Sequence, residues 1–257
     1  MDYEIIDFHT HPYAEESENI CIYKDGAAMR LPDAVRYLRN MGISRICGSV
    51  IGAKTEKPWE MIRRDNDRAL TIRDALGDFY IPGFHVHPDY VAESCREIER
   101  MAARGLTLVG ELVPRFYGWE DYSCSAFDEI LDAAEQYGMV VNFHSLDDDA
   151  MDAMVQKHPG LTLVAAHPNT LAHYQRHLDR MGMSRNYYLD LSGTGLFRHR
   201  MLRYGIDSRG AERFLFGTDY PVCNPAMYIG GVAGDSLLTE QEKELILSGN
   251  VKRLLKL

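Results

Sequence analysis

Two histidines separated by a single residue, His9 and His11, stand near the start of the 257-residue chain. They end the apolar run Tyr3–Phe8, which has the length of a β-strand. Alternate side chains of a strand point to the same face, so both imidazoles can reach one ion. Imidazole is a preferred ligand of zinc and neighbouring transition metals. The spacing therefore predicts a metal-binding pair, although an isolated H-x-H at a strand end can also be two surface histidines.

Other residues that bind metals or carry protons end apolar runs further along the chain, namely Glu111, His144, His167 and Asp219. We predict that His144 supplies a third nitrogen and Asp219 an oxygen to the ion held by the first pair. A set of three histidines and one aspartate suits zinc first and manganese, iron or cobalt after it. The nitrogen content argues against calcium and magnesium.

A second group of residues could contact a substrate. His87 ends a third apolar run, and Arg115 and Tyr117 belong to the segment after a fourth. An arginine there can bind a substrate carboxylate through two parallel hydrogen bonds. We predict that all three contact the substrate, while a structural histidine and a solvated loop charge remain open alternatives. Four further histidines fall on predicted helices, where we expect surface residues: His158, His173, His177 and His199.

The elements that would position these residues alternate along the whole chain. Eight short apolar runs predict strands over Tyr3–Phe8, Arg45–Ile51, Phe79–Phe84, Leu106–Leu112, Met139–Phe143, Leu161–Ala166, Tyr187–Leu191 and Arg213–Gly217. Helical spacing between them predicts helices over Pro32–Met41, Glu60–Leu76, Tyr90–Arg104, Ala126–Tyr137, Ala150–Lys157, Leu171–Arg180 and Leu196–Tyr204. A final helix is expected after Thr239 and Glu242, which form a T-x-x-E capping box.

This alternation and the length predict an α/β fold, a single-domain (β/α)8 TIM barrel over residues 1–257. An open doubly wound sheet is the alternative, but it would normally carry a glycine-rich turn after the first strand, where this chain has His9 and His11. In a TIM barrel the active site lies at the carboxyl ends of the strands, which is where the residues singled out above are expected.

Composition narrows the range of partners and locations. The net charge of −10 disfavours nucleic acid, and the uncharged stretch 220–234 is too short and too rich in proline and glycine to span a bilayer. Five cysteines without a CxxC pair indicate neither a disulfide framework nor a thiolate zinc site. We expect a cytoplasmic protein with a small-molecule substrate and no membrane contact, and a homo-oligomer remains open.

Five segments in barrel order also carry a resemblance: Ile6–His11, His144, Ala166–Pro168, Gly217–Pro221 and Gly249–Leu255. In them the chain resembles the amidohydrolase superfamily, in particular the branch with aminocarboxymuconate-semialdehyde decarboxylase and the pyrone-dicarboxylate lactonases. The resemblance implies metal ligation by His9, His11, His144 and Asp219, with His167 as a proton-transfer or electrophilic group.

The predicted activity follows from this site. A metal ion activates water, Asp219 accepts its proton, and His167 stabilises the developing oxyanion, which predicts hydrolysis of an ester, lactone or amide in a small, carboxylated substrate. A non-oxidative decarboxylase of an unsaturated acid is the first alternative. A TatD-like hydrolase with two ions bridged by Glu111 is the second, although one ion is favoured and Glu111 can instead lie behind the ligands. A non-catalytic binding barrel is the third.

Overall fold

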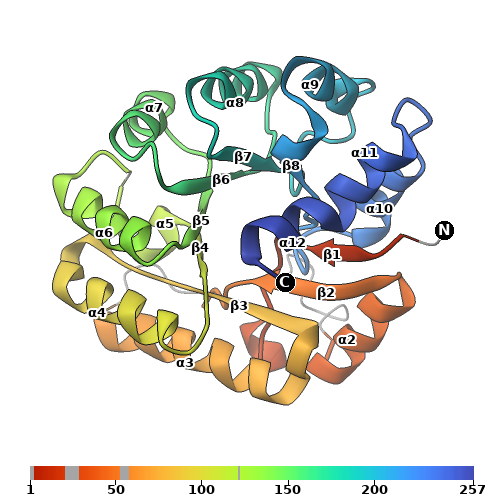
Figure 1. Cartoon of the computed structure of the whole chain (residues 1–257). Helices are drawn as coiled ribbons and strands as arrows, with labels where there is room; N and C mark the ends of the chain where they lie inside the picture. Colours follow the sequence, from red (N-terminus) through yellow and green to blue (C-terminus); the bar gives the residue numbers. More distant parts are fainter. Residues whose placement is uncertain (1–2, 21–28, 53–57, 121) are drawn as a thin grey trace.

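The computed structural model describes residues 3–20, 29–52, 58–120 and 122–257. Parallel strands follow one another around a single sheet in chain order, as Figure 1 shows. They are β1 (Ile5–Asp7), β2 (Ile43–Gly48), β3 (Tyr80–Phe84), β4 (Leu108–Leu112), β5 (Val140–His144), β6 (Thr162–Ala166), β7 (Tyr187–Asp190) and β8 (Phe214–Leu215).

The first and last strands meet and close the sheet. The amide of Phe8 donates to the carbonyl of Phe216 at 2.9 Å, and the amide of Asp219 donates to the carbonyl of His9 at 2.8 Å. Closure leaves no exposed sheet edge in this part of the fold. The predicted TIM barrel is therefore confirmed.

Helices surround the strands on the outside (Figure 1). The longer helices that lie between consecutive strands are α2 (Leu31–Asn40), α3 (Trp59–Leu76), α4 (Val91–Ala102), α6 (Ser125–Gln136), α7 (Asp148–Lys157), α8 (Leu171–Met183) and α9 (Met201–Arg209). The remaining ones are α5 (Pro114–Tyr117), α10 (Pro225–Ala233), α11 (Glu240–Glu244) and α12 (Asn250–Leu255). Each long helix buries one apolar stripe against the sheet; in α4 that stripe includes Ile98 and Met101.

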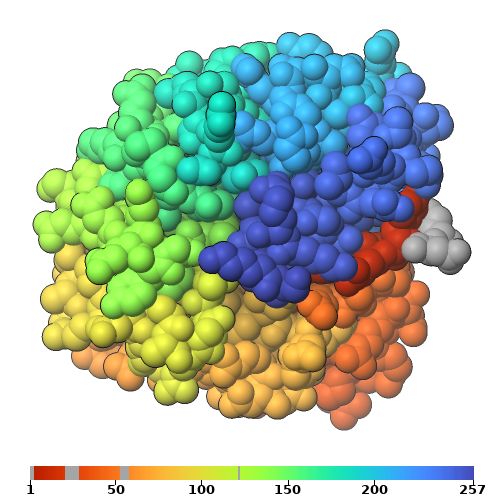
Figure 2. Space-filling model, viewed as in Figure 1, coloured from red at the N-terminus to blue at the C-terminus, as the bar shows by residue number. Residues whose placement is uncertain are grey.

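The inside of the barrel is packed rather than hollow. One apolar cluster joins side chains of β1, β2, β4, β5, β6, β7 and β8 to Val251 and Leu255 of α12. Helix α12 therefore covers the end of the barrel at which the strands begin, and Figure 2 shows the C-terminal segment lying across this face. The opposite end, where the strands finish, carries the site.

The predicted elements overlap the observed ones with small shifts at their ends. The capping box is confirmed: the Thr239 hydroxyl accepts from the Glu242 amide at 3.3 Å, and Glu242 accepts from the Thr239 amide at 2.8 Å. The closing helix begins there as α11, passes through one π-helical turn at Leu245–Gly249, and continues as α12.

Three expectations were wrong. The helix predicted over Leu196–Tyr204 begins only at Met201, because the chain first makes a loop in which Arg200 adopts a φ of 62°. His158 and His177, expected at the surface, are buried at 4% and 0% exposure. His158, just after α7, contacts Asp128 and Asp132 of α6, and His177 of α8 contacts Ser145 and Tyr187. A helical pattern alone does not disclose these contacts. Among the described helices none is long and apolar enough to cross a membrane.

Candidate metal centre

Three predicted ligands meet at the carboxyl end of the barrel. His9 and His11, just after β1, are 1% and 3% exposed, and their Nε2 atoms lie 3.1 Å apart. Asp219, just after β8, places Oδ1 at 3.8 Å from His9 Nε2 and 3.4 Å from His11 Nε2. The hydrogen bonds that close the barrel between β1 and β8 bring these residues together, although 208 positions separate His11 and Asp219 (219 − 11).

Glu111, the fourth residue of β4, lies at the centre of the site. Its Oε2 atom is 3.3 Å from the Nε2 atoms of both His9 and His11. Its Oε1 atom faces the other way, at 2.9 Å from His144 Nδ1 and 3.5 Å from His167 Nε2. One carboxylate thus connects two histidine pairs, His9 with His11 and His144 with His167.

The remaining ring nitrogens determine which atoms of the first pair face this centre. His9 Nδ1 lies 2.9 Å from Asp190 Oδ2 and His11 Nδ1 lies 3.1 Å from the carbonyl oxygen of Ser49. A carboxylate and a carbonyl can only accept hydrogen bonds, so both Nδ1 atoms must donate. The Nε2 atoms of neutral His9 and His11 therefore present lone pairs to each other and to two carboxylates.

Such a cluster of acceptors needs a cation at its centre. Metal–ligand bonds of about 2.0–2.1 Å in tetrahedral geometry place the ligand atoms about 3.3–3.4 Å apart. The five measured separations among His9 Nε2, His11 Nε2, Glu111 Oε2 and Asp219 Oδ1 run from 3.1 to 3.8 Å. His9, Glu111 and His167 form a second group with the spacing of metal ligands. The residues present therefore fit a divalent metal.

The pKa shifts of His11 and Glu111 agree with the need for positive charge at the centre of the site. Burial alone would lower the pKa of His11, but hydrogen bonds to Asp219 and Glu111 outweigh it and raise the pKa to about 9. Burial likewise works to raise the pKa of Glu111, yet the positive charge of His9 and the hydrogen bonds from the other histidines hold it well below its usual range. Without a metal ion, protons supply the positive charge that the carboxylates require.

Buried polar residues that the sequence interpretation missed hold the ligands in place. Asp190, the last residue of β7, is fully buried and accepts hydrogen bonds from His9, from Asn142 Nδ2 at 3.1 Å and from the Ser192 hydroxyl. Ser192 Oγ also lies 3.0 Å from His167 Nδ1. The signal for Asp190 was an acid at the end of an otherwise apolar strand, one of the strand-end positions at which function is expected.

Two of the site residues have unusual backbone conformations. His167 and Asp219 adopt φ values of 69° and 63°, in the left-handed region that side chains other than glycine rarely occupy. Gly193 packs directly against the imidazole, since a Cβ atom built on it would lie 2.3 Å from His167 Nδ1. The loops after β6, β7 and β8 are thus fitted around His167 and Asp219, as is common at functional sites.

The predicted substrate-contacting residues lie in different environments. His87 is buried, with Nε2 at 2.7 Å from the carbonyl of Tyr117 and Nδ1 accepting from the Asp89 amide at 3.1 Å. Both ring nitrogens are used, which favours a structural role over the predicted substrate contact. Tyr117 is buried beside it, and Arg115 is exposed, with its guanidinium 5.3 Å from the ring of Phe116. The substrate contacts of Arg115 and Tyr117 stay predictions.

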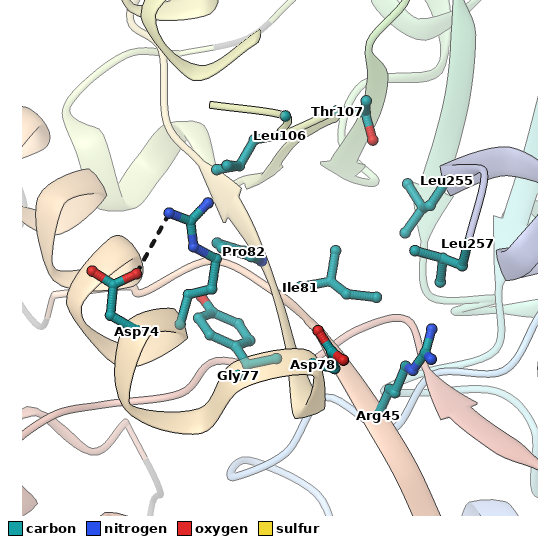
Figure 3. A pocket seen from close by; sticks show the side chains of 13 residues that line it. Arg45, Asp74, Gly77, Asp78, Ile81, Pro82, Leu106, Thr107, Leu255 and Leu257 are labelled. Atoms are coloured by element: carbon teal, nitrogen blue, oxygen red, sulfur yellow. Dashed lines mark ion pairs between the residues drawn. The ribbon is translucent and has the colours of Figure 1, made fainter. Parts of the chain in front are cut away.

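A separate cavity opens at the opposite end of the barrel. Figure 3 shows it: a space of about 580 Å³ with Arg45 and Asp78 near an apolar group that includes Ile81, Leu106 and Leu255. The predicted metal ligands do not line it. The cavity lies where the strands begin, the end that stabilises a TIM barrel rather than the one that carries its chemistry.

The chain matches one known protein family over almost its whole length. The amidohydrolase family model matches residues 6–257, so the chain belongs to that family. No curated protein matches the chain in sequence.

Solved structures of similar fold cover nearly the whole chain at low identity. A 2,6-dihydroxybenzoate decarboxylase with bound 2,6-dihydroxybenzoate has a TM-score of 0.77 at 16% identity, covering 99% of this chain and 98% of the other. The manganese-bound dihydroxybenzoic acid decarboxylase of Polaromonas sp. JS666 has a TM-score of 0.75 at 18% identity, covering 99% and 97%. The probable 2-pyrone-4,6-dicarboxylic acid hydrolase of Acinetobacter baumannii has a TM-score of 0.67 at 13% identity, covering 99% and 100%. These likenesses establish the fold.

Proposed function

We propose that this protein is a metal-dependent hydrolase of small molecules whose site holds two divalent ions bridged by Glu111. The observation that carries the proposal is the orientation of the Glu111 carboxylate, with Oε2 at 3.3 Å from His9 and His11 and Oε1 at 2.9 Å from His144. The sequence favoured one ion, but this arrangement favours two. A carboxylate between two histidine pairs is the arrangement expected of a bridging ligand.

The first ion would be held by His9, His11, Glu111 and Asp219, and the second by Glu111, His144 and His167. Divalent ions in such a site lower the pKa of a coordinated water to about 7 and polarise a carbonyl oxygen, which is the chemistry that hydrolysis requires. The nitrogen and oxygen donors suit zinc first and manganese next. Manganese gains support from the bound ion of the Polaromonas decarboxylase.

The chain's own residues would then move protons and hold charge. Asp219, at the site but still partly accessible, accepts the proton of the attacking water and donates it to the leaving group. If only one ion binds, His167 is free to stabilise the developing oxyanion instead of acting as a ligand. Asp219 is therefore the proton carrier in either case.

Decarboxylation is the second candidate reaction. The similar structures support decarboxylation better than hydrolysis, because two of the three described above are decarboxylases of hydroxybenzoates. In that reaction Asp219 would take a proton from water or from a hydroxyl group of the substrate and pass it to the carbon that loses carbon dioxide. A TatD-like phosphodiesterase also uses a bridged site, but the net charge of −10 disfavours phosphate-rich polymers. The cytoplasmic location, a homo-oligomer and the non-catalytic binding barrel stay predictions.

One experiment separates these reactions. Protein purified with its metals is assayed for metal content and then incubated with lactones, amides, hydroxybenzoates, unsaturated dicarboxylic acids and a generic phosphodiester. Acid release and carbon dioxide are measured in parallel. Hydrolysis is supported by acid release without carbon dioxide that Asp219→Asn abolishes. Carbon dioxide release without consumption of water overturns hydrolysis in favour of decarboxylation, and two ions with no turnover of any compound favours a binding protein.

A further inference from the structure

A chain of hydrogen bonds behind the site joins the loops that carry His144 and His167. The hydroxyl of Ser145, the residue after His144, donates to the carbonyl of Ala166 at 2.6 Å. Ala166 directly precedes His167. One hydroxyl group therefore links the end of β5 to the end of β6 at the two positions where ligands of the second ion are proposed.

The chain continues into α8 in a single direction. The only proton of the Ser145 hydroxyl goes to Ala166, so Ser145 Oγ accepts from His177 Nε2, 3.2 Å away. His177 Nδ1 then accepts from the hydroxyl of Tyr187, at 2.8 Å. Each donor in this series has one acceptor, and successive bonds of this kind polarise one another.

His177 is held firmly and stays neutral. It is fully buried on α8, where the neighbouring Arg180 pairs with Asp148 and Asp152 of α7 at 2.6 Å each. Burial lowers the pKa of His177 to about 3, and the Arg180 charge adds to the effect. A neutral imidazole on a braced helix can fix the hydroxyl of Ser145 in one orientation.

We propose that Ser145 and His177 are positioning residues that set the distance between His144 and His167 and so form the second ion site. The inference rests on the proposed two-ion function. It concerns the separation of two ligands rather than any contact with substrate. Loss of supporting hydrogen bonds behind metal ligands typically costs about 10–100-fold in metal affinity.

The test compares metal titrations of chelator-treated wild type, Ser145→Ala, Ser145→Thr and His177→Leu, using zinc and manganese. We expect Ser145→Ala and His177→Leu to lower the affinity for the second ion about 10-fold or more. The affinity for the first ion should stay unchanged. Ser145→Thr retains a hydroxyl group and should therefore keep the wild-type affinity for the second ion. The matched control is His158→Leu, since His158 is also buried but contacts Asp128 and Asp132 on the outer layer.

Each result has a consequence. Wild-type protein that binds a single ion overturns the two-ion function together with this inference. If wild type binds two ions and both Ser145→Ala and His177→Leu bind them with unchanged affinities, the positioning role alone is wrong. An equal loss of affinity for both ions, or a loss of affinity in His158→Leu as well, indicates general destabilisation. Either result also overturns the positioning role of Ser145 and His177. If His177→Leu does not fold, the Ser145→Ala and Ser145→Thr pair decides.

Discussion

Asp190 Oδ2 lies 2.9 Å from Nδ1 of His9, and the aspartate is fully buried. The contact makes His9 donate through Nδ1 and present the lone pair of Nε2 to the centre of the site. A carboxylate in this position orients a metal-binding imidazole and raises its basicity. Asp190 thus acts on the metal through His9.

Replacing Asp190 with asparagine tests this relationship. The amide can donate to Nδ1 and favour the other tautomer, in which Nε2 carries a proton and cannot bind the ion. We expect Asp190→Asn to lower metal affinity by about 10–100-fold, as measured by competition with a chromogenic chelator. Asp89→Asn is the control, because Asp89 is 73% exposed and outside the site. Affinity within twofold of wild type would show that Asp190 does not set the tautomer.

Glu111→Gln tests the bridge. A neutral amide removes one negative charge from between the two histidine pairs, and its NH2 group would face the lone pairs of one pair. We expect one ion per chain in place of two and a loss of at least about 100-fold in kcat. Elemental analysis after gel filtration gives the ion count. Glu120→Gln, an exposed change on the following loop, should keep both ions, and two ions retained in Glu111→Gln would contradict the bridging role.

The sequence predicted the barrel and the strand-end residues because both follow from local patterns. Apolar runs of strand length recur around the chain, and ligand-type side chains end several of them, as His144 ends β5. It left the role of Glu111 open, because distances across a barrel depend on how the strands close. The position between two histidine pairs became visible only once β1, β4, β5 and β6 were assembled.

Buried histidines were the main failure, for a related reason. The helical pattern places His177 on α8 but does not reveal that Ser145 and Tyr187 meet it on the inner side. Asp190 was missed because an acid at the end of a strand looks the same whether it binds metal, supports a ligand or faces solvent. The burial of His177 and the role of Asp190 both depend on tertiary contacts, which local sequence patterns do not contain.

Gly193→Ala tests how closely the loop after β7 fits His167. The new methyl group would lie 2.3 Å from His167 Nδ1, at a backbone position with a φ of 60°. We expect the imidazole to be displaced, which lowers the affinity for the second ion and lowers kcat. The left-handed backbone should also reduce the free energy of unfolding by about 1–2 kcal/mol. Gly230→Ala is the matched control, since nothing lies within 4 Å of a Cβ atom there. Unchanged kcat and metal affinity in Gly193→Ala would show that the loop can move away at little cost.

The pH dependence of stability tests the state of His177. Its pKa in the folded protein is lowered to about 3, chiefly by burial, whereas the unfolded chain takes up the proton near pH 6.5. A lowered pKa contributes stability above pH 6.5 that is lost as the pH falls towards 3. Between pH 7 and pH 5 the loss amounts to about 2 kcal/mol. Urea unfolding of chelator-treated wild type and His177→Leu at both pH values measures this loss of stability.

We expect the free energy of unfolding of wild type to fall by about 2 kcal/mol more than that of the variant. The other titrating groups are common to both proteins and cancel in the difference. Equal decreases would mean that His177 becomes protonated in the folded protein at pH 5. The protonated ring has no lone pair to accept from Tyr187, so the hydrogen-bond chain to Ser145 would be broken at that pH.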